Sequence, residues 1–310
     1  MLIKSPESPY NCVQPLQYSS AARVAFRTIL ENIDFSNGKK LLLPAYIGIT
    51  DREGSGVLDP VLQTNTPYEF YSLDKKLSAL EDLYKLIKSE KYNALLVIHY
   101  FGFCQNNMEE IVQLCHKHNV LLIEDCAHTM LSDTLFGQLG KLGDFSFNSI
   151  HKFLATKEGG CLRVNNKEYE HLLHLPAPTF PKLKTLDILA RADLSNIREI
   201  RRSNYLHLME MIADVSGIEI MYPELPNGIA PHNLPLLIKD GLRESVYFKL
   251  IDKGIPVVAL YYRMIDQIKI GSYSNALYVS ENILNLPVHQ DIQKGDIDII
   301  AQELRESLKI

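Results

Sequence analysis

Runs of consecutive apolar residues, separated by stretches with helical spacing, mark the first half of the chain. Residues 41–43, 94–98 and 120–123 are apolar almost throughout, which is too uniform for strands with one face in water. Such runs are typical of parallel strands that helices cover on both sides. The alternation of these runs with helical stretches from residue 20 to about 165 therefore predicts a mostly parallel sheet in an α/β domain.

Helices are predicted between and after these strands. Residues 21–31 follow Ser19 and Ser20, whose hydroxyls could cap free amides, and residues 73–91 carry an apolar stripe. A helix should begin near Asn107, because Glu110 stands three residues later as in a capping box. Further helices are expected in the second half of the chain, over residues 194–212 and from about residue 295.

The residue pattern of the chain changes after residue 175. Pro176, Pro178 and Pro181 crowd a short stretch that resembles a linker, and a strand–helix–strand pattern follows over residues 234–262. A chain of 310 residues suits one large and one small domain. We predict a large domain over residues 1–180 and a smaller C-terminal α/β domain over residues 181–310.

Composition narrows the classes of function. Hydrophobic residues make up 46% of the chain and the net charge is −5, so no basic footprint for nucleic acid is present. No apolar run approaches the ~20 residues that span a bilayer, and the first residues lack the apolar core of a signal peptide. The odd, widely spaced cysteines argue against a disulfide framework and against a zinc site. We expect a cytoplasmic protein without a metal, a membrane partner or a nucleic-acid partner.

Candidate chemistry gathers around the third strand. Asp125 ends that strand, and ligands of parallel sheets bind outside the carboxyl ends of the strands. Taken alone, Asp125 is more simply a solvated acid at the end of a strand. It is followed, however, by His128, by a strand-like segment over residues 145–149, and by Lys152 and a double glycine. An amine, a carboxylate and phosphate donors are the groups that pyridoxal phosphate requires.

Four segments carry a resemblance to a known family. They are Val97-Ile98-His99-Tyr100-Phe101-Gly102, Ile123-Glu124-Asp125-Cys126-Ala127-His128, the stretch over residues 140–160, and Ile283-Leu284-Asn285-Leu286-Pro287-Val288-His289. In this order the chain resembles the DegT/DnrJ/EryC1/StrS family of sugar aminotransferases. The resemblance implies the fold type I architecture of aspartate aminotransferase, with pyridoxal 5'-phosphate as cofactor and two subunits in a homodimer. It also implies transfer of an amino group, from glutamate, to a nucleotide-linked keto sugar.

The resemblance also assigns roles to residues. Lys152 would hold the cofactor as a Schiff base and move the substrate proton, and Asp125 would keep the pyridine nitrogen protonated. His128 would lie near the ring and its phenolic oxygen. Ser146 or Ser149 would bind the phosphate, together with the amides around Ala22 and Arg23, where a helix N-terminus favours an anion.

Three departures from the family pattern bear on the substrate. Gly48 stands where the family has an aromatic residue that stacks on the cofactor, and Ala21-Ala22-Arg23 replaces the phosphate motif with glycine and threonine. The mid-chain loop that reaches into the partner subunit is missing from residues 186–205.

Several alternatives stay open at this point. Lys157 competes with Lys152 for the cofactor, and His151 could mark a family branch that dehydrates sugars with histidine. A related enzyme with another carbonyl acceptor and a non-catalytic homologue are further alternatives. A nicotinamide dehydrogenase fits poorly, because no G-x-G-x-x-G follows a predicted strand.

Overall fold

A seven-stranded sheet forms the larger part of the molecule. The computed structural model describes residues 16–309 apart from residues 80, 135–136, 171–174 and 176–178. The strand order is β1-β9-β8-β5-β4-β2-β3, and the strands are β1 (Leu16–Ser19), β2 (Lys40–Pro44), β3 (Tyr68–Tyr71), β4 (Tyr92–Ile98), β5 (Leu121–Asp125), β8 (Phe145–Ser149) and β9 (Gly160–Val164). Neighbours from β3 to β8 are parallel, whereas β9 pairs antiparallel with β8 and β1. The predicted mostly parallel sheet is confirmed.

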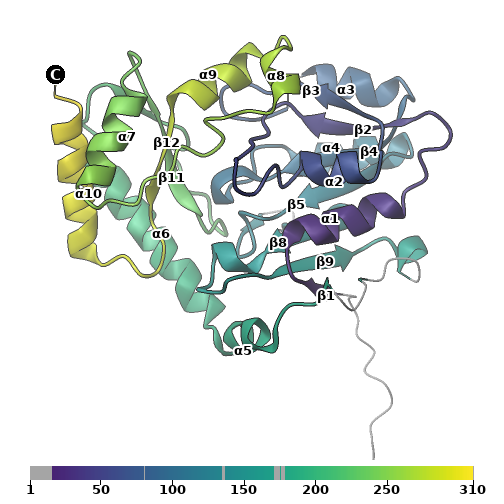
Figure 1. The fold of residues 1–310 in the computed structure, drawn as a ribbon, viewed down its shortest axis with the longest axis horizontal. Coiled ribbons are helices and arrows are strands. Elements are labelled where there is room, and N and C mark those ends of the chain that lie inside the picture. Colours follow the sequence, from purple (N-terminus) through teal and green to yellow (C-terminus); the bar gives the residue numbers. More distant parts are fainter. Residues whose placement is uncertain (1–15, 80, 135–136, 171–174, 176–178, 310) are drawn as a thin grey trace, which may run out of the picture.

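Helices cover both faces of this sheet. Figure 1 shows α1 (Ala22–Glu31) and α2 (Leu58–Gln63) in front of the strands, and α3 (Glu81–Lys88) and α4 (Met108–Lys117) behind them. The middle strands are therefore buried on both faces, as their uniformly apolar sequences require. Three short 3-10 helices complete this part: η1 (Tyr100–Gly102), η2 (Ile150–Lys152) and η3 (Lys167–Tyr169). Two short strands, β6 (Asp133–Thr134) and β7 (Gly137–Gln138), pair antiparallel beside them.

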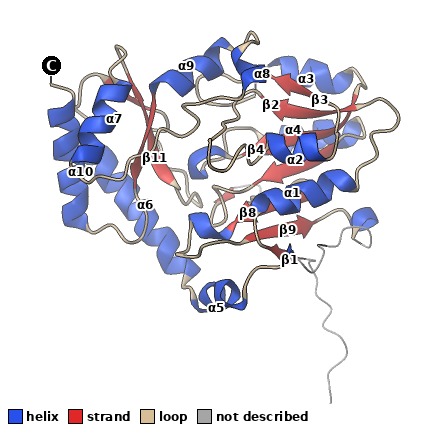
Figure 2. Ribbon diagram, viewed as in Figure 1, coloured by secondary structure: helices blue, strands red, loops and turns tan. Residues whose placement is uncertain are grey.

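A three-stranded antiparallel sheet forms the smaller part. It has the order β10-β11-β12, from β10 (Ile218–Ile220), β11 (Asn233–Ile238) and β12 (Ile283–Pro287). Its helices are α6 (Leu194–Met211), α7 (Arg243–Asp252) and α10 (Lys294–Ser307), and α6 and α7 both pack on α10. The remaining helices are α5 (Leu183–Arg191), α8 (Asp266–Lys269) and α9 (Ser274–Asn282). Figure 2 shows the two sheets as separate sets of strands.

Two local predictions are wrong. The helix expected over residues 73–91 begins only at Glu81, because the Asp74 carboxylate accepts the amides of Lys76 and Ser78 and Leu77 adopts a positive φ of 61°. Leu73 and Leu77 are buried in this turn, so their spacing imitates a helical stripe. The serine cap on α1 is also absent: Ala21 is the N-cap, and the Ser19 hydroxyl donates to the Ala21 carbonyl.

The predicted N-cap of α4 is confirmed. Asn107 caps α4, with its side chain accepting from the Glu110 amide and donating to the Glu110 carboxylate. The cysteines from Cys104 onward are free thiols, while Cys12 lies outside the described residues. Pro176 and Pro178 of the expected linker also lie outside them, and the boundary between residues 180 and 181 stays a prediction. Among the described helices, none has the length and apolarity to cross a membrane.

Candidate active site

A cavity of about 800 Å³ opens at the carboxyl ends of the central parallel strands. Its walls come from the ends of β4, β5 and β8, from the start of α1, and from the segment after β2. A segment over residues 258–263, far away in the sequence, closes another side. Among the sequence-predicted residues, the lining includes Ala22, Arg23, Asp125, His128, Ser149 and Lys152.

Asp125 faces this cavity because of the strand register. It pairs with Ile98 of β4 and with Phe147 of β8, and all three line the cavity. Burial raises the pKa of Asp125, while the Ala127 amide and the charge of Lys152 oppose that shift. One carboxylate oxygen accepts the Ala127 amide at 2.8 Å, and the other accepts no hydrogen bond from the described residues. Asp125 thus offers an acceptor to a ligand in the cavity.

Lys152 reaches the same cavity from the turn after β8, and His128 contacts its amine. The Lys152 Nζ atom lies 2.6 Å from Nε2 of His128, and the Phe101 amide donates to Nδ1 of that ring at 3.2 Å. A neutral imidazole that accepts at Nδ1 carries its proton on Nε2. His128 can then donate to Lys152 only if the lysine amine is neutral.

The electrostatics of the pair agree with this proton arrangement. Burial lowers the pKa of Lys152 to about 8, although Asp125 and Glu53 attract its charge. Burial, followed by the charges of Lys152 and His232, holds the pKa of His128 well below its ordinary value. A neutral amine beside a neutral imidazole is a nucleophile ready for a carbonyl group. Lys157, the rival lysine, is exposed at the rim of the cavity.

Anion donors gather at the start of α1. The helix has no side-chain cap, and Ala22 and Arg23, whose amides have no intrahelical partner, line the cavity. The Ser149 hydroxyl, buried beside them, contacts Nδ1 of His151 at 3.1 Å. Gly160 makes this approach possible, because a Cβ there would lie 2.5 Å from the Ala22 nitrogen. The missing side chain at Gly160 thus lets the segment that follows Lys152 lie against the N-terminus of α1.

Ser146 lies on the other face of the sheet. It pairs with Glu124 rather than with Asp125, and its hydroxyl donates to the Gly140 carbonyl at 2.7 Å. It is absent from the cavity wall, whereas Ser149 lines that wall. The reason is the alternation of side chains along a strand.

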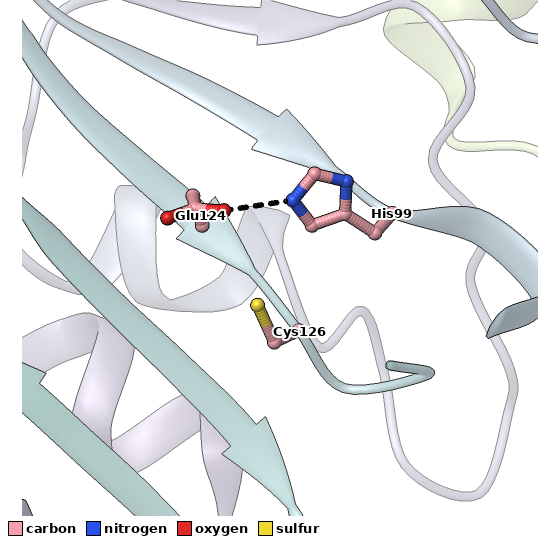
Figure 3. A group of neighbouring side chains, drawn as sticks. All are labelled: His99, Glu124 and Cys126. Carbon is pink, nitrogen blue, oxygen red and sulfur yellow. Dashed lines mark hydrogen bonds and ion pairs between the residues drawn. The ribbon is translucent and has the colours of Figure 1, made fainter. Parts of the chain in front are cut away.

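Glu124 organises the loop behind the sheet rather than the cavity. Its Oε1 accepts the amides of Leu142 and Gly143, and its Oε2 accepts the Gly140 amide and Nε2 of His99. Burial would raise the pKa of Glu124, but His99 and these amides outweigh burial and lower it. Figure 3 shows the His99–Glu124 contact with the Cys126 sulfur beside it. Although His, Glu and Cys are metal-ligand types, all acceptor positions of this carboxylate are already used.

Three residues of the site were missed from the sequence. The His232 ring stacks on His128 with centroids 4.7 Å apart, and the Tyr261 side chain lines the cavity. Arg201, only 2% exposed, lines a second cavity of about 310 Å³ that also touches Lys152. These residues precede or follow no recognisable motif, and the segments that carry them, helix α6 for Arg201, meet the site only through tertiary packing. The one available signal was the unusual glycine at position 48.

The residues present fit pyridoxal phosphate. A lysine that can be neutral, a buried carboxylate with a free oxygen, and helix amides beside a serine hydroxyl all face one cavity. Its volume lies within the usual range of roughly 300–1,000 Å³ for small-molecule sites. The chemistry of the donors, rather than any single contact, makes this match.

Comparison with known proteins agrees with the resemblance. The model of the DegT/DnrJ/EryC1/StrS aminotransferase family matches residues 76–176. GDP-perosamine synthase of Escherichia coli O157:H7 is 28% identical over 170 residues, which are 53% of this chain and 44% of that protein. UDP-N-acetyl-3-dehydro-alpha-D-glucosamine 3-aminotransferase of Acidithiobacillus ferrooxidans is 22% identical, over 92% of this chain and 82% of that protein. The chain thus aligns with less than half of the first of these relatives and most of the second.

Solved structures share the whole fold. The aminotransferase PseC of Helicobacter pylori, involved in the biosynthesis of pseudoaminic acid, superposes with a TM-score of 0.78 at 17% identity, over 94% of this chain and 86% of that one. The aminotransferase TlmJ of Streptoalloteichus hindustanus gives a TM-score of 0.76 at 20% identity, over 94% and 85%. The predicted fold type I architecture is confirmed. Residues 186–205, where the cross-subunit loop of the family is expected to be missing, lie in α5, α6 and the turn between them.

Proposed function

We propose that this chain, whose residues 76–176 match the model of the DegT/DnrJ/EryC1/StrS aminotransferase family, is a pyridoxal-phosphate-dependent aminotransferase acting on a nucleotide-linked keto sugar. The observation that carries the proposal is the convergence of Lys152, His128 and Asp125 on one cavity, where burial lowers the pKa of the lysine amine to about 8. The relatives that act on nucleotide sugars support the acceptor class.

Each residue has a part in this proposal. Lys152 would hold the aldehyde of the cofactor and would move a proton to and from the substrate carbon. Asp125 would keep the proton on the ring nitrogen. Once Lys152 is bonded to the cofactor, His128 would be free to donate a hydrogen bond from Nε2 to the bound cofactor. Ser149 and the amides of Ala22 and Arg23 hold the phosphate. When bound, pyridoxal phosphate supplies the conjugated ring that accepts electrons from the substrate carbon.

The smaller cavity supports a carboxylate-bearing amino donor such as glutamate. Arg201 lies in its wall, where burial lowers the pKa of the guanidinium to about 10 against the attraction of Asp291. The guanidinium donates to the carbonyls of Pro231 and His232 and to Gln290, none of which carries a charge. A buried cation without a carboxylate contact favours an anionic group nearby.

The visible spectrum tests the function directly. Cofactor-loaded protein should absorb near the visible band of the lysine-bound cofactor, lose that band on addition of glutamate, and regain it with a nucleotide-linked keto sugar. Recovery only with another ketone would replace the proposed acceptor, and no loss with any amino donor would contradict an aminotransferase. Light scattering on the same sample should give the mass of a homodimer, which we propose from the resemblance to the family.

A pH dependence follows from the lowered pKa of Lys152. The neutral amine is the reactive form, and its fraction falls as pH drops below about 8. The rate at which apoprotein captures pyridoxal phosphate should therefore rise about tenfold per pH unit below pH 8 and level off above it. Stopped-flow absorbance measures this rate. A rise that continues to pH 10 would show that Lys152 titrates as an ordinary lysine.

A further inference from the structure

Tyr261 occupies an unusual place in the cavity wall. It comes from the turn after residue 258, yet it lies beside the segment that follows β2. Its ring packs against those of Tyr46 and Tyr100, with centroids 5.4 Å and 6.4 Å away and planes at 64° and 84°. Two nearly perpendicular neighbours of this kind fix the position of an aromatic ring.

Gly48 leaves the space that the Tyr261 ring occupies. A Cβ built on Gly48 would lie 2.2 Å from Cδ1 and 2.8 Å from Cγ of Tyr261. No positive φ requires glycine at this position, so the ring itself is the reason for the missing side chain. Tyr261 therefore fills the space into which a side chain at position 48 would project.

Hydrogen bonds hold the two segments together around this contact. The Ile49 amide donates to the Arg263 carbonyl at 3.0 Å, and the Ile265 amide donates to the Ile47 carbonyl at 3.1 Å. The Tyr46 hydroxyl donates to the Leu260 carbonyl at 2.8 Å. Position 261 is thus clamped on both sides by contacts with residues 46–49.

The backbone of Tyr261 is strained. Its φ is +63°, a left-handed conformation that a bulky aromatic residue seldom adopts. The Ser280 hydroxyl donates to the Tyr261 carbonyl at 2.8 Å and keeps this conformation in place. Strain of this kind persists where the surrounding structure requires one orientation, and it gathers at functional sites.

The environment of the cavity also affects the Tyr261 hydroxyl. Burial, together with the charge of Asp125, raises the pKa of Tyr261, so the phenol stays protonated. Among the described residues, none receives or gives a hydrogen bond at this hydroxyl. A neutral phenol beside Asp125 is therefore available to a ligand in the cavity.

We infer that Tyr261 is a positioning residue that supplies, from the C-terminal half of the chain, the aromatic surface on which the flat ring of the cofactor packs. It takes the place that Gly48 leaves open. This inference rests on the proposed function, because it needs a planar conjugated ligand between Asp125 and Lys152. Stacked rings of this kind gain stability beyond the area that they bury.

Cofactor binding measured without turnover tests the inference. Apoprotein is titrated with pyridoxamine phosphate, which binds without a covalent bond to Lys152, and with pyridoxal phosphate, whose bound band is recorded. Tyr261→Leu should weaken the binding of both by about tenfold and shift the band, whereas Tyr261→Phe should stay within about threefold of the wild type. Wild-type affinity in Tyr261→Leu would overturn the inference.

Tyr273→Leu is the matched control. Tyr273 also packs on a glycine, with its Cε2 2.5 Å from a Cβ built on Gly271, and has an edge-on neighbour in Phe70 at 6.1 Å. It lies outside the cavity wall, so the affinity for both cofactor forms should not change. A loss in Tyr273→Leu equal to that in Tyr261→Leu would show a general packing effect and contradict the inference.

A double variant provides a second test in case Tyr261→Leu does not fold. Gly48→Phe combined with Tyr261→Gly returns a ring to the same space from the other segment, and it should bind both cofactor forms within about threefold of the wild type. A folded double variant that binds more than tenfold more weakly would overturn the inference. If the wild type itself binds neither form, the proposed function fails, which separates that outcome from a failure at Tyr261 alone.

Discussion

Alanine in place of Lys152 is expected to reduce transamination by about 10⁴-fold or more. The variant loses both the covalent anchor of the cofactor and the amine that moves the substrate proton. No neighbouring group can replace it: His128 is held neutral with Nδ1 occupied by the Phe101 amide, and its pKa lies well below the ordinary value. Initial rates with glutamate and a keto sugar measure the effect.

Lys157→Ala is the matched control for this prediction. Lys157 lies five residues further along the same segment and also reaches the cavity rim, but its side chain is exposed. Its removal should change the rate by no more than about twofold, because an exposed lysine contributes little. Loss of activity in Lys157→Ala with retention in Lys152→Ala would exchange the roles of the two lysines.

Asparagine in place of Asp125 should slow both half-reactions by roughly 10²- to 10⁴-fold. The change keeps the size of the side chain but removes the charge that holds a proton on the ring nitrogen. Burial already raises the pKa of Asp125, so the carboxylate is costly to keep charged unless a cationic partner lies against its free oxygen. Cofactor should still attach through Lys152, which the visible band shows independently of turnover.

The variant Glu124→Gln distinguishes an effect on the active site from an effect on the stability of the fold. Glu124 is the neighbour of Asp125 in sequence but lies on the opposite face, where it binds three loop amides and His99. We expect this variant to lower the free energy of unfolding by about 1–3 kcal/mol and to keep the half-reactions of the folded protein. Equal half-reaction defects in Asp125→Asn and Glu124→Gln would mean that Asp125 acts only through the fold.

Much of the site was predictable because its parts are local in sequence. Asp125 ends an apolar run, and Lys152 follows a strand of alternating phenylalanines, so the rule for parallel sheets places both at one edge. The choice between Ser146 and Ser149 was not predictable, because it depends on which residue of β8 pairs with Asp125. That register is set by tertiary packing and is invisible in either segment alone.

The rest of the site depends on contacts between distant segments. Tyr261 meets Gly48 only because residues 260–265 pair with residues 46–49, more than two hundred positions earlier. His232 reaches His128 because its amide donates to the carbonyl of Phe101, whose φ is positive. Neither pairing has a periodic pattern that sequence reasoning could use. The wrong helix prediction over residues 73–79 has the opposite cause, since buried leucines in a turn had helical spacing by coincidence.

Borohydride reduction followed by peptide mapping tests the central claim most directly. Protein incubated with pyridoxal phosphate is reduced, digested and analysed by mass spectrometry, which locates the lysine that carries the cofactor. The account predicts one reduced cofactor on Lys152, with Lys157 unmodified. Cofactor on Lys157 alone, or no modified peptide after incubation with excess pyridoxal phosphate, would contradict it.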